Sequence, residues 1–547
     1  MSETQTRAAT FFDQAVAHHQ AGRLVEAKRL YRQTLTVDPK HADSLHLLGL
    51  IAREAGDTAV ARDLFGKALA IDDANAMYHN SLGVVLQEMG KLDLAVSSLR
   101  RAISIEADYA EAHNNLGNAM REQGRFEEAE DAYRRGIALQ PRYAKAHNNL
   151  GIVLKERGDL ENAAASYRRA LEFNPGYVEA HNNLGVALTA ADRLSEAAAS
   201  FGQAIALRPT YAQAHNNLGV VLKEQDKLAD AESSYGKAAI LDPNLVDAHV
   251  NLGHALFDRD KRDGAAAAAA AARKLNPPPG AVQFPLGDLM LKLGDTKAAE
   301  EHLRSYLTFD RADSMGARLL LASFGAEALP AQASDAFVRD LYAKRAAFWD
   351  RTAAAEHPYR GARLVADAAR RVLGEKSDAD ILDAGCGTGL VGALLRPHVR
   401  RIDGVDLSPP MIEAAAQKGV YETLAEGDLA AFMQLHPGAY DAVLSAATLI
   451  HFGDLRPVFD AAHAALRPGG AFVFTAFPHD GETPSSGFAV APITGLAYGG
   501  CYAHGPTYIA RTAEAADFSV ASIDRDTHEH HKGQPVTGLV VSLRRKT

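Results

Sequence analysis

The chain has 547 residues, enough for more than one domain, and 47% of them are hydrophobic, enough for a sizeable core. The formal net charge of −10, without a long basic run, argues against nucleic acid or an anionic membrane surface as a general partner. The only two cysteines, Cys386 and Cys501, argue against a disulfide framework and favour a cytoplasmic location. The polar segment 1–13 lacks a signal-peptide core, and no apolar run predicts a transmembrane helix.

A period of 34 residues runs through the first half of the chain. Alanine keeps this period from Ala27 to Ala299, and an aromatic or apolar residue follows it by four positions, from Tyr31 to Tyr235. The same period is marked by the dipeptide Leu-Gly at Leu48-Gly49, Leu82-Gly83, Leu116-Gly117, Leu150-Gly151, Leu184-Gly185, Leu218-Gly219, Leu252-Gly253 and Leu286-Gly287.

This pattern resembles the tetratricopeptide repeat family over residues 8–313, as about nine units. The small residues let the two helices of a unit approach closely, and the ring fills the space beside them. One helical pair cannot bury its apolar face alone, so the units are expected to stack into an all-α solenoid with a concave surface. The resemblance implies that this surface recruits a protein or peptide.

Paired asparagines lie on the first helix of successive units. The second members of the pairs, with one related asparagine, are Asn115, Asn149, Asn183, Asn217 and Asn251. The spelling His-Asn-Asn-Leu-Gly resembles the asparagine ladder of O-linked N-acetylglucosamine transferases, which implies a groove that holds a peptide main chain. Asparagine both donates and accepts hydrogen bonds. The alternative interpretation is that these side chains bond to neighbouring helices.

The period fades after Arg311. Residues 314–335 are predicted to form a capping helix, over Ala317–Ser323, and a linker with a break at Pro330. Strand and helix patterns then alternate, so residues 336–547 are expected to form an α/β domain with a parallel sheet. Strands are predicted over Asp380–Ala384, Arg401–Asp406, Glu422–Glu426, Ala442–Ser445, Ala471–Ala476, Val520–Ile523 and Gly538–Leu543.

The first of these strands runs into a glycine loop, within Ile381–Leu390. Asp383 precedes Gly385, Gly387 and Gly389, in a spacing that does not meet the dinucleotide fingerprint. The loop resembles motif I of class I S-adenosylmethionine-dependent methyltransferases. That resemblance implies a seven-stranded Rossmann-like sheet and S-adenosylmethionine as the cofactor, with these four residues at its site.

Further residues match the same family's cofactor site. Asp406 ends the second strand, where a carboxylate can accept hydrogen bonds from both ribose hydroxyls. The resemblance implies that Met411 packs on the adenine, and that Asp428, with Leu429 beside it, accepts a hydrogen bond from the adenine amino group. Segments around Asp406 and His504 extend the resemblance to predicted methyltransferases that carry tetratricopeptide repeats.

A catalytic base is needed only where the nucleophile must lose a proton. His451, after the fourth strand, and His504, in a late loop, are the candidates, although each is also explained as a structural histidine. The cluster His528–His531 fits no complete ligand set, and no metal site is predicted.

The sequence therefore predicts a methyltransferase whose repeat scaffold recruits a peptide or protein, with the methyl acceptor left open. The alternative is an interaction scaffold whose methyltransferase fold binds cofactor but has little activity. The intact glycine loop and the two acidic residues that follow it favour the enzyme.

Overall fold

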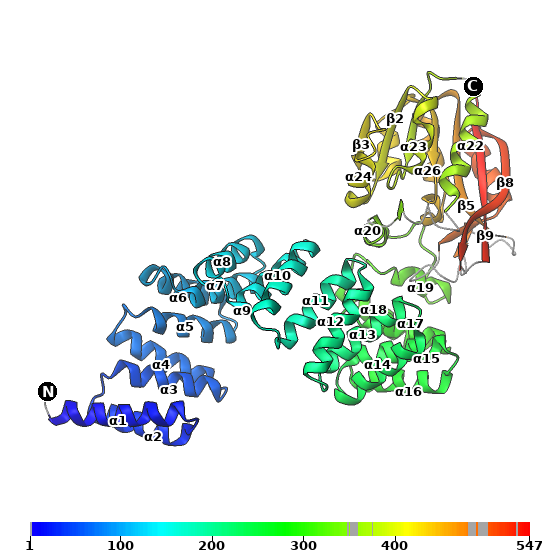
Figure 1. Cartoon of the computed structure of the whole chain (residues 1–547). Helices are drawn as coiled ribbons and strands as arrows, with labels where there is room; N and C mark the ends of the chain where they lie inside the picture. The colour runs from blue at the N-terminus through cyan, green and yellow to red at the C-terminus, as the bar shows by residue number, and fades with distance from the viewer. Residues whose placement is uncertain are drawn as a thin grey trace. The chain divides into compact units, whose positions relative to one another are not determined.

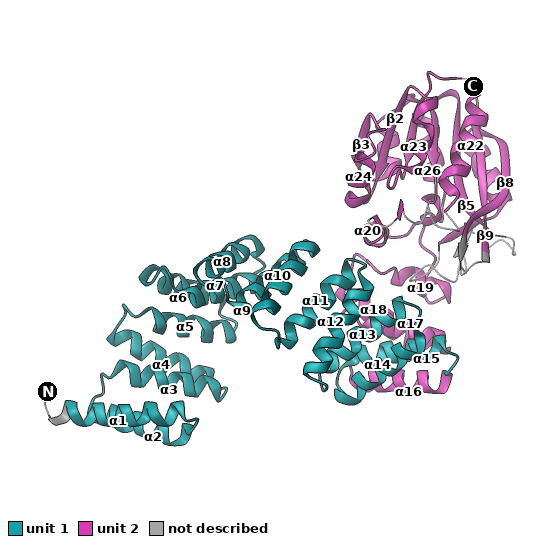
Figure 2. Ribbon diagram, viewed as in Figure 1, with its two compact units in different colours: residues 1–261 teal, residues 262–547 magenta. Residues whose placement is uncertain are grey.

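The structure is a computed structural model that describes residues 3–346, 349–350, 359–374, 376–479, 488–490, 501–531 and 534–547. The chain divides into two compact units, Met1–Lys261 and Arg262–Thr547 (Figure 2). In the described part of the chain, no helix combines the length and the apolar character needed to cross a membrane.

Unit 1 is a series of antiparallel helix pairs (Figure 1). Its helices are α1 (Glu3–Gln20), α2 (Leu24–Val37), α3 (Ala42–Glu54), α4 (Thr58–Ile71), α5 (Ala76–Glu88), α6 (Leu92–Ile105), α7 (Ala110–Glu122), α8 (Phe126–Leu139), α9 (Ala144–Glu156), α10 (Leu160–Phe173), α11 (Val178–Ala190), α12 (Leu194–Leu207), α13 (Ala212–Glu224), α14 (Leu228–Leu241) and α15 (Val246–Asp258). The predicted tetratricopeptide solenoid is confirmed.

The periodic glycine of each first helix lies against the periodic ring of the second. A Cβ placed on Gly49 would lie 2.5 Å from the Phe65 ring, and one on Gly117 would lie 2.6 Å from the Tyr133 ring. Real Cβ atoms do not approach so closely, so only glycine fits at these positions. The alanines of the second helices are fully buried, as Ala61 and Ala129 illustrate.

The histidine of the His-Asn-Asn-Leu-Gly spelling fixes the loop that precedes its own helix. Its Nε2 lies within hydrogen-bond distance of a backbone carbonyl six residues earlier, and because a carbonyl only accepts, Nε2 carries the proton. The distance is 3.1 Å from His113 to Ala107 and 2.9 Å from His147 to Pro141. This role of the histidines was not predicted.

The asparagines bond from one repeat to the next. In each bond, the amide nitrogen of one asparagine donates to the amide oxygen of an asparagine 35 residues earlier. The bonds run from Asn115 to Asn80 (2.9 Å) and, each at 3.0 Å, from Asn149 to Asn114, Asn183 to Asn148, Asn217 to Asn182, and Asn251 to Asn216. The asparagines therefore do bond to neighbouring helices, as the alternative interpretation expected. Peptide binding by the same side chains stays a prediction.

Replacing Asn115, Asn149, Asn183 and Asn217 together by alanine should lower the melting temperature of the repeats, measured by far-ultraviolet circular dichroism. Each lost bond contributes about 0.5–1.5 kcal/mol, and the better helix propensity of alanine offsets only part of the sum. Asn244→Ala, at an exposed turn, is the matched control. Equal melting temperatures for the fourfold variant and the control would contradict a stabilising role for these bonds.

Unit 2 begins with helices and continues into a sheet. Its helices are α16 (Arg262–Lys274), α17 (Gln283–Leu293), α18 (Thr296–Phe309), α19 (Ala317–Ser323), α20 (Asp335–Ala343), α22 (Gly361–Leu373), α23 (Leu390–Leu395), α24 (Pro409–Ala416), α25 (Leu429–Gln434), α26 (Arg456–Ala465) and α27 (Pro506–Ala515), with short 3₁₀ turns η1 (Arg396–His398) and η2 (Leu449–His451). Helix α19 has the predicted bounds of the capping helix.

The sheet contains all seven predicted strands. They are β1 (Asp380–Ala384), β2 (Arg401–Asp406), β3 (Thr423–Glu426), β4 (Tyr440–Ser445), β5 (Leu466–Pro478), β8 (Phe518–His531) and β9 (Gln534–Arg545). They lie in the order β3-β2-β1-β4-β5-β9-β8, with β1 to β5 parallel and β9 antiparallel to both neighbours. The predicted fold class is confirmed. Two short strands, β6 (Phe488–Val490) and β7 (Tyr502–His504), were not predicted and extend from the end of β5.

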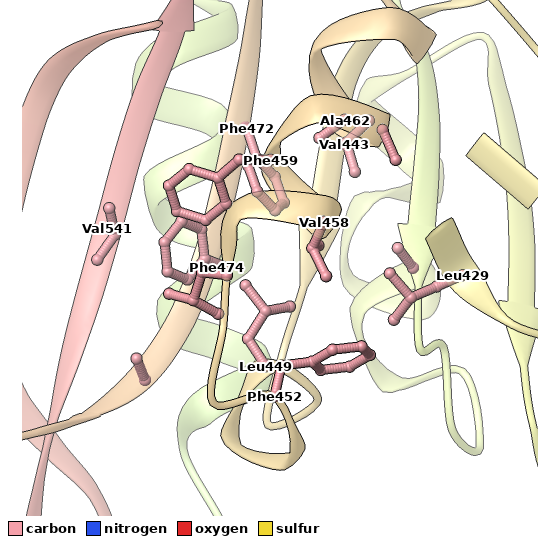
Figure 3. Close-up of a cluster of buried hydrophobic side chains, with 14 of the residues drawn as sticks. Leu429, Val443, Leu449, Phe452, Val458, Phe459, Ala462, Phe472, Phe474 and Val541 are labelled. Atoms are coloured by element: carbon pink, nitrogen blue, oxygen red, sulfur yellow. The ribbon is translucent and has the colours of Figure 1, made fainter. Parts of the chain in front are cut away.

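Alternate strand residues face two hydrophobic cores, because successive side chains of a strand point to opposite faces. Ile381 packs in the core beneath α22 and α23, whereas Leu382 packs in the core with α25, α26 and α27. Figure 3 shows the second core, where the Phe459 ring meets Phe472 and Phe474 at centroid distances of 5.6 and 5.5 Å.

The segment after α19 joins this second core. Leu319 and Ala333 are buried in it, and Gln332 forms a β-bridge with Phe452. The Ala333 N–H donates to the His451 carbonyl at 2.8 Å, and the Ala331 carbonyl accepts from Gly453 at 2.8 Å. Residues before the predicted domain start at 336 therefore share the core of the sheet.

A fragment of residues 312–547 should unfold at a higher temperature than one of residues 336–547. The shorter fragment loses the buried Leu319 and Ala333 and both backbone bonds of the bridge segment, and burial of one leucine side chain alone contributes about 1.5–3 kcal/mol. Thermal unfolding followed by the fluorescence of Trp349, the chain's single tryptophan, measures the difference. Equal stability would show that the linker is dispensable.

Candidate active site

A pocket lies at the carboxyl ends of β1, β2 and β4, on either side of the point where the strand order reverses. This edge is where open α/β sheets bind ligands. The pocket contains about 890 Å³ of space outside protein atoms, including open solvent at its mouth. Of the predicted cofactor residues, its lining includes Gly385, Gly387, Asp406, Met411, Asp428 and Leu429.

The glycine loop turns through a backbone shape that glycine favours. Gly385, Gly387 and Gly389 have φ values of 80°, 52° and 87°. A Cβ on Gly385 would lie 2.1 Å from the Thr448 hydroxyl, so this position also needs glycine for space. Gly389 has the turn geometry but does not line the pocket.

The Asp406 carboxylate connects this loop to the end of β2. Its Oδ2 accepts from the Gly387 N–H at 2.8 Å, and its Oδ1 accepts from the Ser408 N–H at 2.9 Å. Burial raises the pKa of Asp406, and these backbone donors oppose that rise. A carboxylate has about four acceptor sites, so both oxygens keep capacity for donors in the pocket.

Asp383 is fully buried behind the loop rather than on the pocket wall. Its Oδ2 accepts from the Tyr421 hydroxyl at 2.7 Å, while its Oδ1 has no hydrogen-bond partner among the described residues. Burial raises the pKa of Asp383 to about 7, with the Tyr421 bond opposing the rise. A buried carboxylate oxygen with spare capacity is suited to a cationic or donor group.

The other end of the pocket is lined by residues that follow β2 and β3. Met411 is buried in α24, directly after Asp406 along the chain. Asp428 caps α25, where its carboxylate accepts from the Ala431 N–H at 2.8 Å, and Leu429 is buried next to it. The cap leaves Asp428 partly exposed on the pocket wall.

The structure separates the two candidate bases. His451 lines the pocket, and its Nε2 lies 2.9 Å from the Tyr342 hydroxyl. Burial, helped by the nearby charge of Arg345, lowers the pKa of His451 to about 4. His504 is fully buried outside the pocket lining, with its Nε2 3.0 Å from the Gly453 carbonyl. His451 therefore lies in the pocket lining, and His504 does not.

His528, the first residue of the predicted histidine cluster, is buried, and burial lowers its pKa to about 4. Its carbonyl accepts from the Arg360 N–H at 2.7 Å. The side chains of His530 and His531 lie outside the described residues.

The aromatic residues of the pocket were not predicted as site residues. Tyr342, Trp349 and Tyr359 all line it, although they precede the glycine loop in the chain. A second missed contact holds the loop itself, where Asp350 accepts from the Thr388 hydroxyl at 2.5 Å and pairs with Lys418. Neither set carries a local motif that could have placed it at the site.

This arrangement of fold and site defines a methyltransferase-type domain preceded by helical repeats, and comparisons with known proteins agree. The methyltransferase domain family matches residues 382–474, and tetratricopeptide repeat families match residues 6–142, 120–201, 187–226 and 250–314. The chain is thus a tetratricopeptide-repeat protein that carries a methyltransferase domain.

Three similar proteins illustrate the two parts. The malonyl-[acyl-carrier protein] O-methyltransferase of Pseudescherichia vulneris is 32% identical over 113 residues, 21% of this chain and 45% of the relative. Methyltransferase-like protein 27 of Homo sapiens is 44% identical over 89 residues, 16% and 36% of the two chains. A tetratricopeptide repeat protein of Parabacteroides merdae has 18% identity, a TM-score of 0.38, and 46% and 98% coverage. The chain spans less than half the length of the curated relatives it matches.

Asp383→Asn should flatten the pH dependence of stability between about pH 4 and 7. The folded-state pKa of Asp383 is raised to about 7 from the ordinary value of 3.8, so its stabilising contribution is present at low pH and is lost as pH rises through that range. Asparagine keeps an acceptor for Tyr421 but does not ionise. The melting temperature of the variant relative to the native protein, followed by Trp349 fluorescence, should therefore rise with pH.

Asp57→Asn, at an exposed position of the repeats, is the control for charge removal. A difference between the Asp383 variant and the native protein that stays constant with pH would contradict the shifted pKa.

Proposed function

We propose that this protein is an S-adenosylmethionine-dependent methyltransferase with a repeat scaffold that recruits a protein or peptide. The scaffold would comprise residues 8–313, joined through residues 314–335 to a catalytic domain of residues 336–547. The observation that carries the proposal is the bond between the Gly387 N–H and the Asp406 carboxylate. It joins a three-glycine turn to an acidic strand end at the pocket, as a nucleoside site requires.

The residues of the pocket fit this cofactor. Asp406 has spare acceptor sites for the ribose hydroxyls, and Met411 offers an apolar surface for the adenine. Asp428 is exposed to the pocket, where it could accept from the adenine amino group. Asp383 is buried behind the loop and does not line the pocket, so we assign it to holding the loop in place, through its bond to Tyr421, for the cofactor.

When bound, the cofactor supplies a methyl group on a sulfonium, which is an electrophile with a good leaving group. The chain's own contribution is then to hold an acceptor in line with that methyl and to exclude water, and such positioning can supply much of the rate enhancement. Members of this domain family generally use S-adenosylmethionine, which supports the assignment.

The repeats support a recruiting role because tetratricopeptide domains generally bind proteins or peptides. Peptide binding by Asn115, Asn149, Asn183, Asn217 and Asn251 must use the amide atoms left over from their bonds to one another. Asn149 has no amide hydrogen left for a peptide, since its amide nitrogen donates to both Asn114 and Asn118 at 3.0 Å. We place the protein in the cytoplasm, with neither nucleic acid nor membrane as a partner.

The alternative, an interaction scaffold with weak activity, predicts a damaged site. The glycines of the loop and both Asp406 and Asp428 are present in the pocket region with their hydrogen bonds formed. The enzyme is therefore the better supported proposal, and no observation favours the scaffold alone.

Asp406→Ala should weaken S-adenosylmethionine binding by roughly 1.5–3 kcal/mol, because hydrogen bonds to a charged group are of that order. Isothermal titration calorimetry on the full chain measures the change. Asp406→Asn keeps one acceptor oxygen and should lose less affinity. Asp460→Ala, at an exposed ion pair of α26, should bind as the native protein does. Unchanged affinity in a folded Asp406→Ala variant would exclude the ribose assignment.

A further inference from the structure

Four rings form a continuous aromatic wall in the pocket. The ring centroids of Tyr359 and Trp349 are 5.7 Å apart, those of Trp349 and Tyr342 are 5.8 Å apart, and those of Tyr342 and His451 are 5.4 Å apart. All four residues line the pocket. The cofactor residues proposed above include none of them, so the aromatic wall is available to the methyl acceptor. A wall of aromatic side chains favours an acceptor with a flat ring of its own, which can stack on these rings or meet them edge to face.

The charges of the pocket restrict that acceptor further. Among its described lining residues, the carboxylic acids are Asp335, Asp406 and Asp428, and neither lysine nor arginine is present. An anionic acceptor would meet these carboxylates in the lining, and the nearby cation, Arg345, lies outside it. Burying a charge without a partner in the pocket is costly. The lining thus favours an uncharged aromatic compound over a carboxylate or phosphate.

Tyr342 and His451 together offer a hydrogen-bond acceptor to a hydroxyl group of such a compound. The Tyr342 hydroxyl lies 2.9 Å from His451 Nε2 and 3.4 Å from the Ala447 carbonyl, so its shorter contact is with the histidine. Because burial lowers its pKa to about 4, His451 is neutral at pH 7 and its Nε2 can accept from the tyrosine. The phenol oxygen of Tyr342 then keeps a lone pair for a donor in the pocket.

We propose that the pocket takes an uncharged aromatic hydroxyl compound as methyl acceptor, with Tyr342 and His451 as a relay for its proton. This inference rests on the proposed function. As the acceptor oxygen forms its bond to the methyl carbon, its hydrogen passes to Tyr342 Oη and the tyrosine's own hydrogen passes to His451 Nε2. The carbon–sulfur electron pair stays with the sulfur. One positive charge leaves the sulfur and one appears on the imidazole, so the net charge of the pocket is unchanged.

Trp349 makes the acceptor part of the pocket observable, because it is the chain's single tryptophan and lies in the aromatic wall. The full chain, saturated with S-adenosylhomocysteine, is titrated with phenol, benzoate and cyclohexanol. Trp349 fluorescence is excited at the red edge of its absorption, where phenol does not absorb. Phenol should bind at least about tenfold more tightly than benzoate, which has the ring without a neutral hydroxyl, and than cyclohexanol, which lacks the aromatic ring.

Tyr342→Phe keeps the ring and removes the relay. It should weaken phenol binding roughly threefold to tenfold, the effect of one neutral hydrogen bond, and leave affinity for S-adenosylhomocysteine within about twofold. Transfer of labelled methyl from S-adenosylmethionine to phenol should fall at least roughly 100-fold in Tyr342→Phe and in His451→Asn. Tyr211→Phe, in the repeats, is the matched control. N-acetyltyrosine amide in place of phenol distinguishes a tyrosyl side chain from a free phenol.

Equal binding of benzoate and phenol, or absence of methyl transfer to both phenolic probes, would overturn the acceptor class. Unchanged transfer in Tyr342→Phe would overturn the relay. Failure of S-adenosylhomocysteine itself to bind, measured by calorimetry, identifies a failure of the proposed function instead.

Discussion

The Asp406 carboxylate accepts from two backbone amides that belong to two different turns, and the whole site depends on this contact. One amide is that of Gly387 in the loop after β1, and the other is that of Ser408 at the start of α24. The contact sets the distance between the turns and so the width of the pocket. Because Gly385 has no side chain, Thr448 in the turn after β4 can pack directly against the glycine loop. Three strand ends thereby form one cavity.

The repeats depend on a different constraint, which is the close approach of two helices. Glycine on one helix and a ring on the other fix the spacing within a pair, as at Gly117 and Tyr133. Asparagine bonds then fix the spacing between pairs, as from Asn149 to Asn114. Such amide bonds restrict how the repeats slide past each other, and they use part of the polar groove that a peptide would need.

Features set by local sequence could be predicted, and those set by distant contacts could not. All seven main strands follow from apolar runs, and Asp406 follows from its place at a strand end after the glycine loop. The place of Met411 in the pocket was implied by the family resemblance. The Tyr342–His451 pair joins residues 109 positions apart, and no local pattern links them. His504 carried the same kind of signal as His451 in the sequence, yet its backbone partner at Gly453 holds it outside the pocket. An asparagine side chain can bond either to a peptide or to a neighbouring helix, and the amide of the preceding repeat is brought within reach by helix packing, which no local pattern shows.

The segment between the repeats and the sheet packs into the core of the sheet and anchors part of the pocket. Leu319 of the capping helix is buried in the same core as the strands, and the Gln332–Phe452 bridge places the chain beside η2, which carries His451. Helix α20 follows at once and contributes Tyr342. The aromatic wall therefore includes side chains whose backbone is anchored by residues that precede the predicted catalytic domain. A domain boundary at residue 336 separates this anchor from the pocket that it supports. The repeat pattern of the sequence ends before residue 336, but the packing of the segment against the sheet crosses that position.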